Sequence, residues 1–203
     1  MLLSDFGGEF AFLRKITETS SDSRVIVGNG DDAAVFEMGG TFIAVSTDTI
    51  VEGDHFSLTY FTPRQIGIKS VEASASDIVA MGGRPEFLFF SLCVPRDLPV
   101  EVLDGMYDGI REARLRLGAE VHGGDMTHGS QFIVSVTVMG SIEKREFISP
   151  RSGAKAGDLI YVTGPLGGST AGLRLFQTNT LGFEDVKRKH CEPRCRIDVV
   201  NLI

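Results

Sequence analysis

Aspartates set among glycines and small polar residues are the feature of this sequence with the clearest chemical potential. Carboxylate oxygens are the ligands that magnesium prefers, and a phosphoryl-transfer site uses such cations to neutralise phosphate charge. Carboxylates gathered in one pocket would repel one another unless a cation lay among them. The set therefore predicts a magnesium site, and its members are Asp31 and Asp32 in GNGDDAAV, Asp48 in STDT, Asp54 in VEGDHF, Asp77 in SASDIVAMGG and Asp125 in HGGDMTHG.

A simpler interpretation stays open for each aspartate taken singly, because aspartate beside glycine is typical of turns. The sequence contains no GxxxxGK[ST] phosphate-binding loop and no HRD or DFG motif of the protein kinases. Any use of ATP must therefore rely on another way of holding its phosphates.

The composition limits the possible partners. The chain has 203 residues, of which 42% are hydrophobic and 23% charged, and its formal net charge is −7. An acidic chain is a poor candidate for sequence-blind binding of nucleic acid. No stretch approaches the ~20 apolar residues of a membrane helix, and the first residues lack the basic region of a signal peptide. We therefore expect a cytoplasmic protein with no nucleic-acid or membrane partner.

Hydrophobic periodicity and turn residues predict helices and strands that do not alternate in the regular order of a doubly wound fold. We therefore expect a mixed α/β (α+β) fold. Proline at a first helical position marks the start of two of the helices. The predicted helices span residues 6–19, 63–81, 99–118 and 169–177, and the predicted strands span 24–28, 33–36, 41–46, 86–94, 120–122, 131–140 and 158–163.

Small residues replace the apolar pattern at 149–157, with the sequence SPRSGAKAG. Such a run is typical of a linker, and we predict two domains, one over 1–148 and the beginning of a second over 149–203. The second part is short for an independent domain. Within it, the segment GPLGGS at 164–169 fits either an anion site at a helix amino terminus or a tight connection between a strand and a helix.

Five segments together resemble a known enzyme family: GNGDDAAVF, STDTIVEGDHF, SDIVAMGGRP, GGD followed by Thr127, and RSGAKAGDLIYVTG. They occur in this order in thiamine-monophosphate kinases, which are related to aminoimidazole ribonucleotide synthetase. The string STDTIVEGDHF is the most specific, because related branches share only the GDD-like and GGD-like motifs. The resemblance covers almost the whole chain. It implies an aminoimidazole ribonucleotide synthetase-like amino-terminal domain with a mixed sheet, followed by the start of a second α/β domain.

The resemblance also implies roles at the matching positions. Arg151 would contact the nucleotide, since a guanidinium is suited to gripping phosphate, and His55 would contact thiamine monophosphate. Tyr107 would face the adenine, although packing alone would also explain a tyrosine on a helix. The implied metal ligands are Asp32, Ser46, Thr47, Asp48, Asp77 and Asp125, with Asp31 close by, and Gly124 and Asp125 would lie along the ATP phosphates.

The implied activity is magnesium-dependent, in-line transfer of the γ-phosphoryl group of ATP to thiamine monophosphate, in a homodimer and without a catalytic base. Family members continue with SDGL-type and GGEDYE-type segments, neither of which occurs here. The chain is therefore expected to be truncated at its carboxy-terminal end. Two alternatives stay open: another ATP-using enzyme of the same superfamily, and a nucleotide-binding or dimerisation module without turnover.

Overall fold

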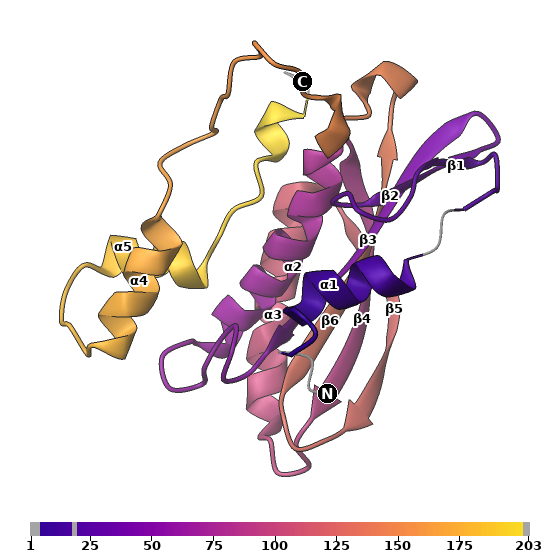
Figure 1. Cartoon of the computed structure of the whole chain (residues 1–203). Coiled ribbons are helices and arrows are strands. Elements are labelled where there is room, and N and C mark those ends of the chain that lie inside the picture. The colour runs from indigo at the N-terminus through magenta and orange to yellow at the C-terminus, as the bar shows by residue number, and fades with distance from the viewer. Residues whose placement is uncertain (1–4, 18–19, 201–203) are drawn as a thin grey trace.

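The computed structural model describes residues 5–17 and 20–200. In this part of the chain one six-stranded sheet carries two long helices, α2 and α3, side by side on one face (Figure 1). The helices are α1 (Gly8–Ile16), α2 (Pro63–Ala80), α3 (Val100–Leu117), α4 (Gly168–Gln177) and α5 (Glu184–Cys191), with short 3-10 turns η1 (Arg145–Phe147), η2 (Arg151–Gly153) and η3 (Ile197–Val199). The strands are β1 (Val25–Val27), β2 (Ala34–Met38), β3 (Thr41–Val51), β4 (Arg84–Val94), β5 (Glu120–His128) and β6 (Ile133–Ile142).

The sheet is mixed, with the strand order β1-β2-β3-β6-β4-β5. All neighbouring strands are antiparallel except β4 and β5, which are parallel and are connected through α3. A parallel pair requires such a crossover, whereas the tight turn at Gly39 and Gly40 is enough to join β2 to β3. The prediction of a mixed α/β fold is therefore confirmed.

Local sequence explains where α2 begins and ends. The Thr62 hydroxyl accepts from the main-chain N–H of Gln65, and the Gln65 side chain accepts from the N–H of Thr62, which is a complete capping box. Pro63 occupies the first helical position, where its missing N–H costs nothing. The helix stops before Gly82, whose positive φ of 82° favours glycine.

The two faces of the sheet differ because side chains alternate along each strand. On the central strand β6, Val134, Val136 and Val138 are buried beneath the helices. The residues between them, including Ser135 and Thr137, are only partly buried on the opposite face. The sheet therefore has one face packed into the core and one open face.

Two strands, β3 and β5, extend well beyond their predicted ends, whereas the ends of the other observed strands differ from their predicted positions by about two residues. β3 continues to Val51 instead of ending at residue 46, because its pairing with β6 persists as far as Ile133. β5 continues to His128 instead of ending at residue 122, because β4 pairs with its glycine-rich part. Asp48 and Asp125 consequently lie inside strands, whereas the sequence predicted them at strand ends.

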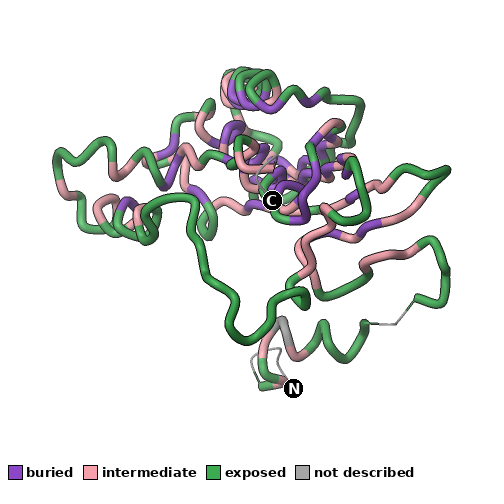
Figure 2. Tube along the Cα trace, turned by 90° about the horizontal axis from the view of Figure 1, so that it is seen from above, coloured by how far each residue is buried: buried purple, intermediate pink, exposed green. Residues whose placement is uncertain are grey.

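The prediction of a strand at 158–163 is wrong. These residues adopt no regular structure, and Leu159, Ile160 and Tyr161 are 77%, 95% and 83% exposed. A strand needs a neighbour for its main-chain groups, and no described strand pairs with this segment. The whole connection at 151–167 is exposed (Figure 2). The predicted domain boundary, between residues 148 and 149 and so just before this connection, stays a prediction.

The helix predicted at 169–177 is confirmed as α4, whereas α5 was not predicted because its charged sequence EDVKRKHC has no apolar period. The helix predicted at 6–19 is shorter, since α1 ends at Ile16, and Thr19 lies outside the described residues. None of the helices in the described ranges is long and apolar enough to cross a membrane.

A buried ion pair fastens the segment after α5 to the long helices. The Glu72 side chain on α2 is 2% exposed and pairs with Arg116 of α3. The main-chain N–H of Cys195 donates to Glu72 Oε2 at 2.7 Å, and the Arg116 guanidinium donates to the carbonyl of Cys195 at 3.1 Å. These bonds satisfy a carboxylate that would otherwise be costly to bury. We call these three residues the tail clamp.

The contact between α2 and α3 leads to a prediction about stability. We predict that Gly109→Ala will destabilise the protein, because a Cβ there would lie 1.9 Å from the main-chain oxygen of Arg64. Overpacking of this kind costs about 1–3 kcal/mol, against a gain of about 1 kcal/mol from the helix propensity of alanine. Urea unfolding measures the net loss, with exposed Leu115→Ala on the same helix as control. An unchanged midpoint would contradict the close packing.

Candidate functional site

Three of the predicted metal ligands, Asp32, Asp48 and Asp77, interact electrostatically, and we call them the carboxylate group. Asp32 lies just before β2, Asp48 lies within β3, and Asp77 lies near the end of α2. The Ser46 hydroxyl donates a hydrogen bond of 2.7 Å to Asp77 Oδ2, which joins β3 directly to α2. The structure thus brings together four predicted ligands from three parts of the chain.

The environment of Asp77 shows that burial and negative charge outweigh the positive charge near the carboxylate group. Burial is the main cause that raises the pKa of Asp77 above its ordinary value of 3.8. The hydrogen bond from Ser46 lowers this pKa, while the charges of Asp48 and Asp32 raise it further. Burial and like charges both disfavour the ionised carboxylate, so a bound cation would relieve both effects.

Arg151 supplies one positive charge beside this group. Its guanidinium pairs with Asp32, and its main-chain N–H donates to Asp31 Oδ1 at 3.1 Å. The Asp32 carboxylate raises the pKa of Arg151. The Arg151 side chain is 62% exposed, so a ligand can reach it. Arg151, predicted at the nucleotide, therefore lies next to two of the predicted acidic residues.

The side chain of Thr47 lies on the opposite face of the sheet from those of Ser46 and Asp48. Its hydroxyl is 2.9 Å from that of Thr137, on the open face. Because side chains alternate along a strand, Thr47 cannot turn its hydroxyl toward its neighbours' ligand atoms. Only its main-chain carbonyl is available to a cation bound by the carboxylate group.

Asp125 lies apart from the carboxylate group within the single chain. Its register partner on β4 is Ser91, which in turn faces Ser135 of β6 on the open face. Strands β6 and β4 separate β5 from β3, so three steps of about 4.8 Å place the main chains of Asp125 and Asp48 about 14 Å apart. The role of Asp125 as a metal ligand stays a prediction.

Gly124 and Tyr107, both predicted at the nucleotide, share one neighbour. Gly124 is paired with Phe90, and a Cβ at Gly124 would lie 1.8 Å from the carbonyl oxygen of Phe90. The ring of Tyr107, on α3, lies 6.4 Å from the Phe90 ring and is 37% exposed. The two residues therefore lie together near the β5 edge of the sheet. At Gly124 the main chains of β5 and β4 lie closer together than any residue with a Cβ would permit.

His55, predicted to contact thiamine monophosphate, lies in a tight loop that follows β3. Its main-chain N–H donates to the carbonyl of Val51 at 2.9 Å. Its ring Nδ1 accepts from the N–H of Val51 at 3.3 Å, which leaves Nε2 to carry the proton in the neutral ring. The Asp54 carboxylate is 3.5 Å from the same Nδ1 but is 82% exposed, so the main-chain contact decides the tautomer.

The donor set fits magnesium by its chemistry. Asp32, Asp48, Asp77 and Ser46 offer only oxygen atoms, which hard cations prefer. Among the described residues, no three His, Cys, Asp or Glu side chains are already arranged to hold a metal. This is partly because the carboxylate of Asp32 is directed toward the Arg151 guanidinium, with which it pairs.

The sequence did not point to Lys69, whose ammonium contacts the loop of His55 at 2.7 Å. The available signal was a lysine within the stretch IGIKSVEAS of α2, where the other residues apart from Glu72 are apolar or small. A long cationic side chain at such a position usually extends to solvent, so its charge alone indicated nothing specific.

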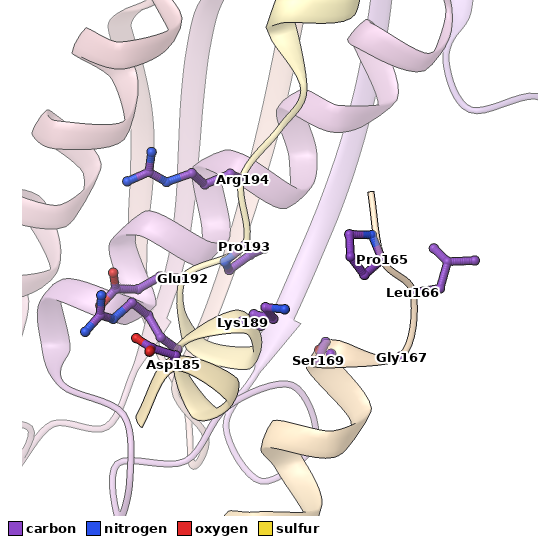
Figure 3. A pocket seen from close by; sticks show the side chains of 11 residues that line it. Pro165, Leu166, Gly167, Ser169, Asp185, Lys189, Glu192, Pro193 and Arg194 are labelled. Atoms are coloured by element: carbon purple, nitrogen blue, oxygen red, sulfur yellow. The ribbon is translucent and has the colours of Figure 1, made fainter. Parts of the chain in front are cut away.

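The glycine-rich turn before α4 borders a cavity of about 490 Å³, seen in Figure 3. A Cβ at Gly168 would lie 2.6 Å from the side chain of Lys189, and one at Gly172 would lie 2.6 Å from the carbonyl of Val186. The close packing of α4 against α5 therefore explains why both positions are glycine. The cavity is lined by two acidic residues, Asp185 and Glu192, and by three basic ones, Arg188, Lys189 and Arg194, so its charges leave the anion-site interpretation open.

Comparison with known proteins identifies a family for most of this site. The family described as AIR synthase related protein, N-terminal domain, matches residues 30–142. A thiamine-monophosphate kinase of Mycobacterium tuberculosis is 37% identical over 188 residues, which cover 92% of this chain and 56% of the relative. The thiamine-monophosphate kinase of Bacillus subtilis is 37% identical over 203 residues, covering 96% and 62%. The chain thus spans about three-fifths of the length of these relatives.

Solved structures agree with the sequence comparison. A ThiL protein complexed with AMPPCP and TMP superposes with a TM-score of 0.90 at 31% identity, covering 100% of this chain and 64% of that protein. Thiamine monophosphate kinase from Aquifex aeolicus gives a TM-score of 0.84 at 31% identity, covering 100% and 65%. The fold expected from the motifs is therefore confirmed.

The raised pKa of Asp77 leads to a prediction about pH. Between 3.8 and the raised value the folded protein binds the proton more tightly than the unfolded chain, so stability falls as pH rises through this window. In the presence of a chelator, Asp77→Asn is therefore expected to be more stable than the wild type at pH 7. The difference should vanish below about pH 3.8, where both states are protonated.

Urea unfolding at pH 3.5 and pH 7 measures this difference, and Asp104→Asn on the exposed side of α3 is the control. Equal stability of the wild type and Asp77→Asn at both pH values would show that Asp77 ionises in the fold without penalty.

Proposed function

The chain belongs to the AIR synthase related family, and from that membership we propose that it acts in the ATP-dependent phosphorylation of thiamine monophosphate. One observation carries this proposal. The carboxylate group and Ser46 lie together in a chain that superposes along its whole length on a ThiL protein complexed with AMPPCP and TMP. The relatives named thiamine-monophosphate kinase support the same substrate.

Asp32, Ser46, Asp48 and Asp77 would hold magnesium, which when bound neutralises phosphate charge. The remaining work is positioning, which dominates phosphoryl transfer. The phosphate of thiamine monophosphate is already an anionic nucleophile at neutral pH, so the proposal includes no catalytic base. The Nε2–H of His55 is suited to donate to a phosphate oxygen of this substrate.

Arg151 would bind the nucleotide through its exposed guanidinium. A guanidinium can hold carboxylate and phosphate oxygens at once, because it presents five donors in one plane. Arg151 would thus remain beside Asp32 while it contacts ATP. Gly124 and Tyr107 would lie along the phosphates and the adenine at the β5 edge.

The proposal also includes a homodimer and a cytoplasmic location. The open face of the sheet and the exposed strand β5 support self-association, because an unpaired edge favours pairing with another chain.

We predict that the 203-residue chain, incubated with magnesium, ATP and thiamine monophosphate, forms thiamine diphosphate. Chromatography of the products measures this directly, and omission of magnesium is the control. Turnover of a different acceptor would favour another enzyme of the superfamily. Binding of magnesium-ATP without any product would favour a nucleotide-binding module, and a longer chain carrying the part present in the relatives would then be assayed.

We also predict that Asp125→Ala weakens the binding of magnesium-ATP by at least about tenfold, since charged interactions of this kind contribute about 1.5–3 kcal/mol. Isothermal titration measures the affinity, and Asp108→Ala on the exposed surface of α3 is the control. An unchanged affinity, together with a loss in Asp48→Ala, would restrict the metal site to the carboxylate group.

A further inference from the structure

Three of the contacts that hold the loop of His55 bear on its position. The main-chain N–H of Gly53 donates to the carbonyl of Phe56 at 2.8 Å, and that of His55 donates to the carbonyl of Val51 at 2.9 Å. These two bonds are internal to the loop and fix its shape. The third contact comes from outside, since Lys69 Nζ donates to the His55 carbonyl at 2.7 Å.

Lys69 is well placed to anchor this loop. It lies on α2 between buried residues Ile68 and Ser70, and its ammonium lies 5.1 Å from the centre of the Phe61 ring. Burial lowers the pKa of Lys69, which means that its surroundings disfavour the charged ammonium. A hydrogen bond to a carbonyl and a contact with an aromatic face are the two interactions that compensate a partly buried ammonium.

We propose that Lys69 is a positioning residue for the phosphate of the acceptor substrate. It ties the main chain at His55 to α2 and thereby fixes where Nε2–H of the ring meets a phosphate oxygen. This inference rests on the proposed function for the identity of the acceptor. The same helix carries Asp77 two turns further on, so one rigid element sets the positions of both the carboxylate group and the His55 ring.

The geometry favours an indirect role over direct contact with the substrate. The ammonium already donates to the His55 carbonyl and lies against Phe61, whose side chain is 4% exposed. The groups facing Lys69 from α5 are His190 and Cys191. They belong to the packed interface with α2 and leave no anionic partner for Lys69 there.

The first experiment compares Lys69→Met with the wild type by titration of thiamine monophosphate and, separately, of magnesium-ATP. We expect the affinity for thiamine monophosphate to fall about tenfold and the affinity for magnesium-ATP to change less than twofold. Lys144→Met is the matched control, because it also removes an ammonium that lies 5.3 Å from a phenylalanine ring, that of Phe147. Equal losses for both ligands would indicate general damage and overturn the proposal.

The second experiment repeats the substitution in a His55→Ala background. If Lys69 acts through His55, the added substitution changes the affinity for thiamine monophosphate less than twofold. A further tenfold loss in that background would show an independent contact and overturn the positioning role. Lys69→Arg, which keeps a cationic donor, should recover most of the affinity.

Amide hydrogen exchange tests the anchor without any substrate. Lys69→Met should speed the exchange of the Gly53 and His55 amides at least tenfold while the amides within β6 stay unchanged, and unchanged loop amides would overturn the anchor. If the wild-type chain does not bind thiamine monophosphate, the proposed function fails, and the exchange rates alone then decide the anchor. If Lys69→Met does not fold, Lys69→Gln takes its place in all three experiments.

Discussion

The close contact between α2 and α3 is the constraint on which the rest of the structure depends. Glycines at 67 and 109 allow the two helix backbones to touch, where a Cβ would come within about 2 Å of a carbonyl oxygen. The position of α2 over the sheet is thereby fixed. Three of its polar side chains then reach different parts of the chain: Lys69 the loop after β3, Glu72 the segment after α5, and Asp77 strand β3. A helix that is buried around most of its circumference thus organises three separate polar contacts.

The sequence predicted the fold class and the types of ligand well, because both depend on local pattern. Asp32, Ser46, Asp48 and Asp77 were recognised from short motifs, and the structure brings them together. The face of the sheet on which a side chain lies was harder to predict, because neighbouring residues of a strand point to opposite faces. Thr47 illustrates this, because the motif placed it with its neighbours while the pairing of β3 with β6 turns its hydroxyl to the open face.

Contacts between residues distant in sequence could not be predicted. The strand proposed at 158–163 has the right composition, but no described strand pairs with it, and composition alone cannot supply a neighbour. Arg151 was expected at a nucleotide, yet its pairing with Asp32 depends on how the chain returns to the sheet after β6. Lys69 and the tail clamp are of the same kind, since each joins residues that no local pattern relates.

The tail clamp makes the end of the described chain part of the cooperative core. Opening the segment around Cys195 would leave Glu72 paired with Arg116. It would remove the main-chain donor of the Glu72 carboxylate and the main-chain acceptor of the Arg116 guanidinium, and a buried carboxylate that loses a hydrogen bond is destabilised. The segment around Cys195 is therefore held by the same charged pair that joins the two long helices. Because Glu72 and Arg116 lie on α2 and α3, the protection of the Cys195 amide from solvent exchange reports on the integrity of helices that precede it by some 80–120 residues.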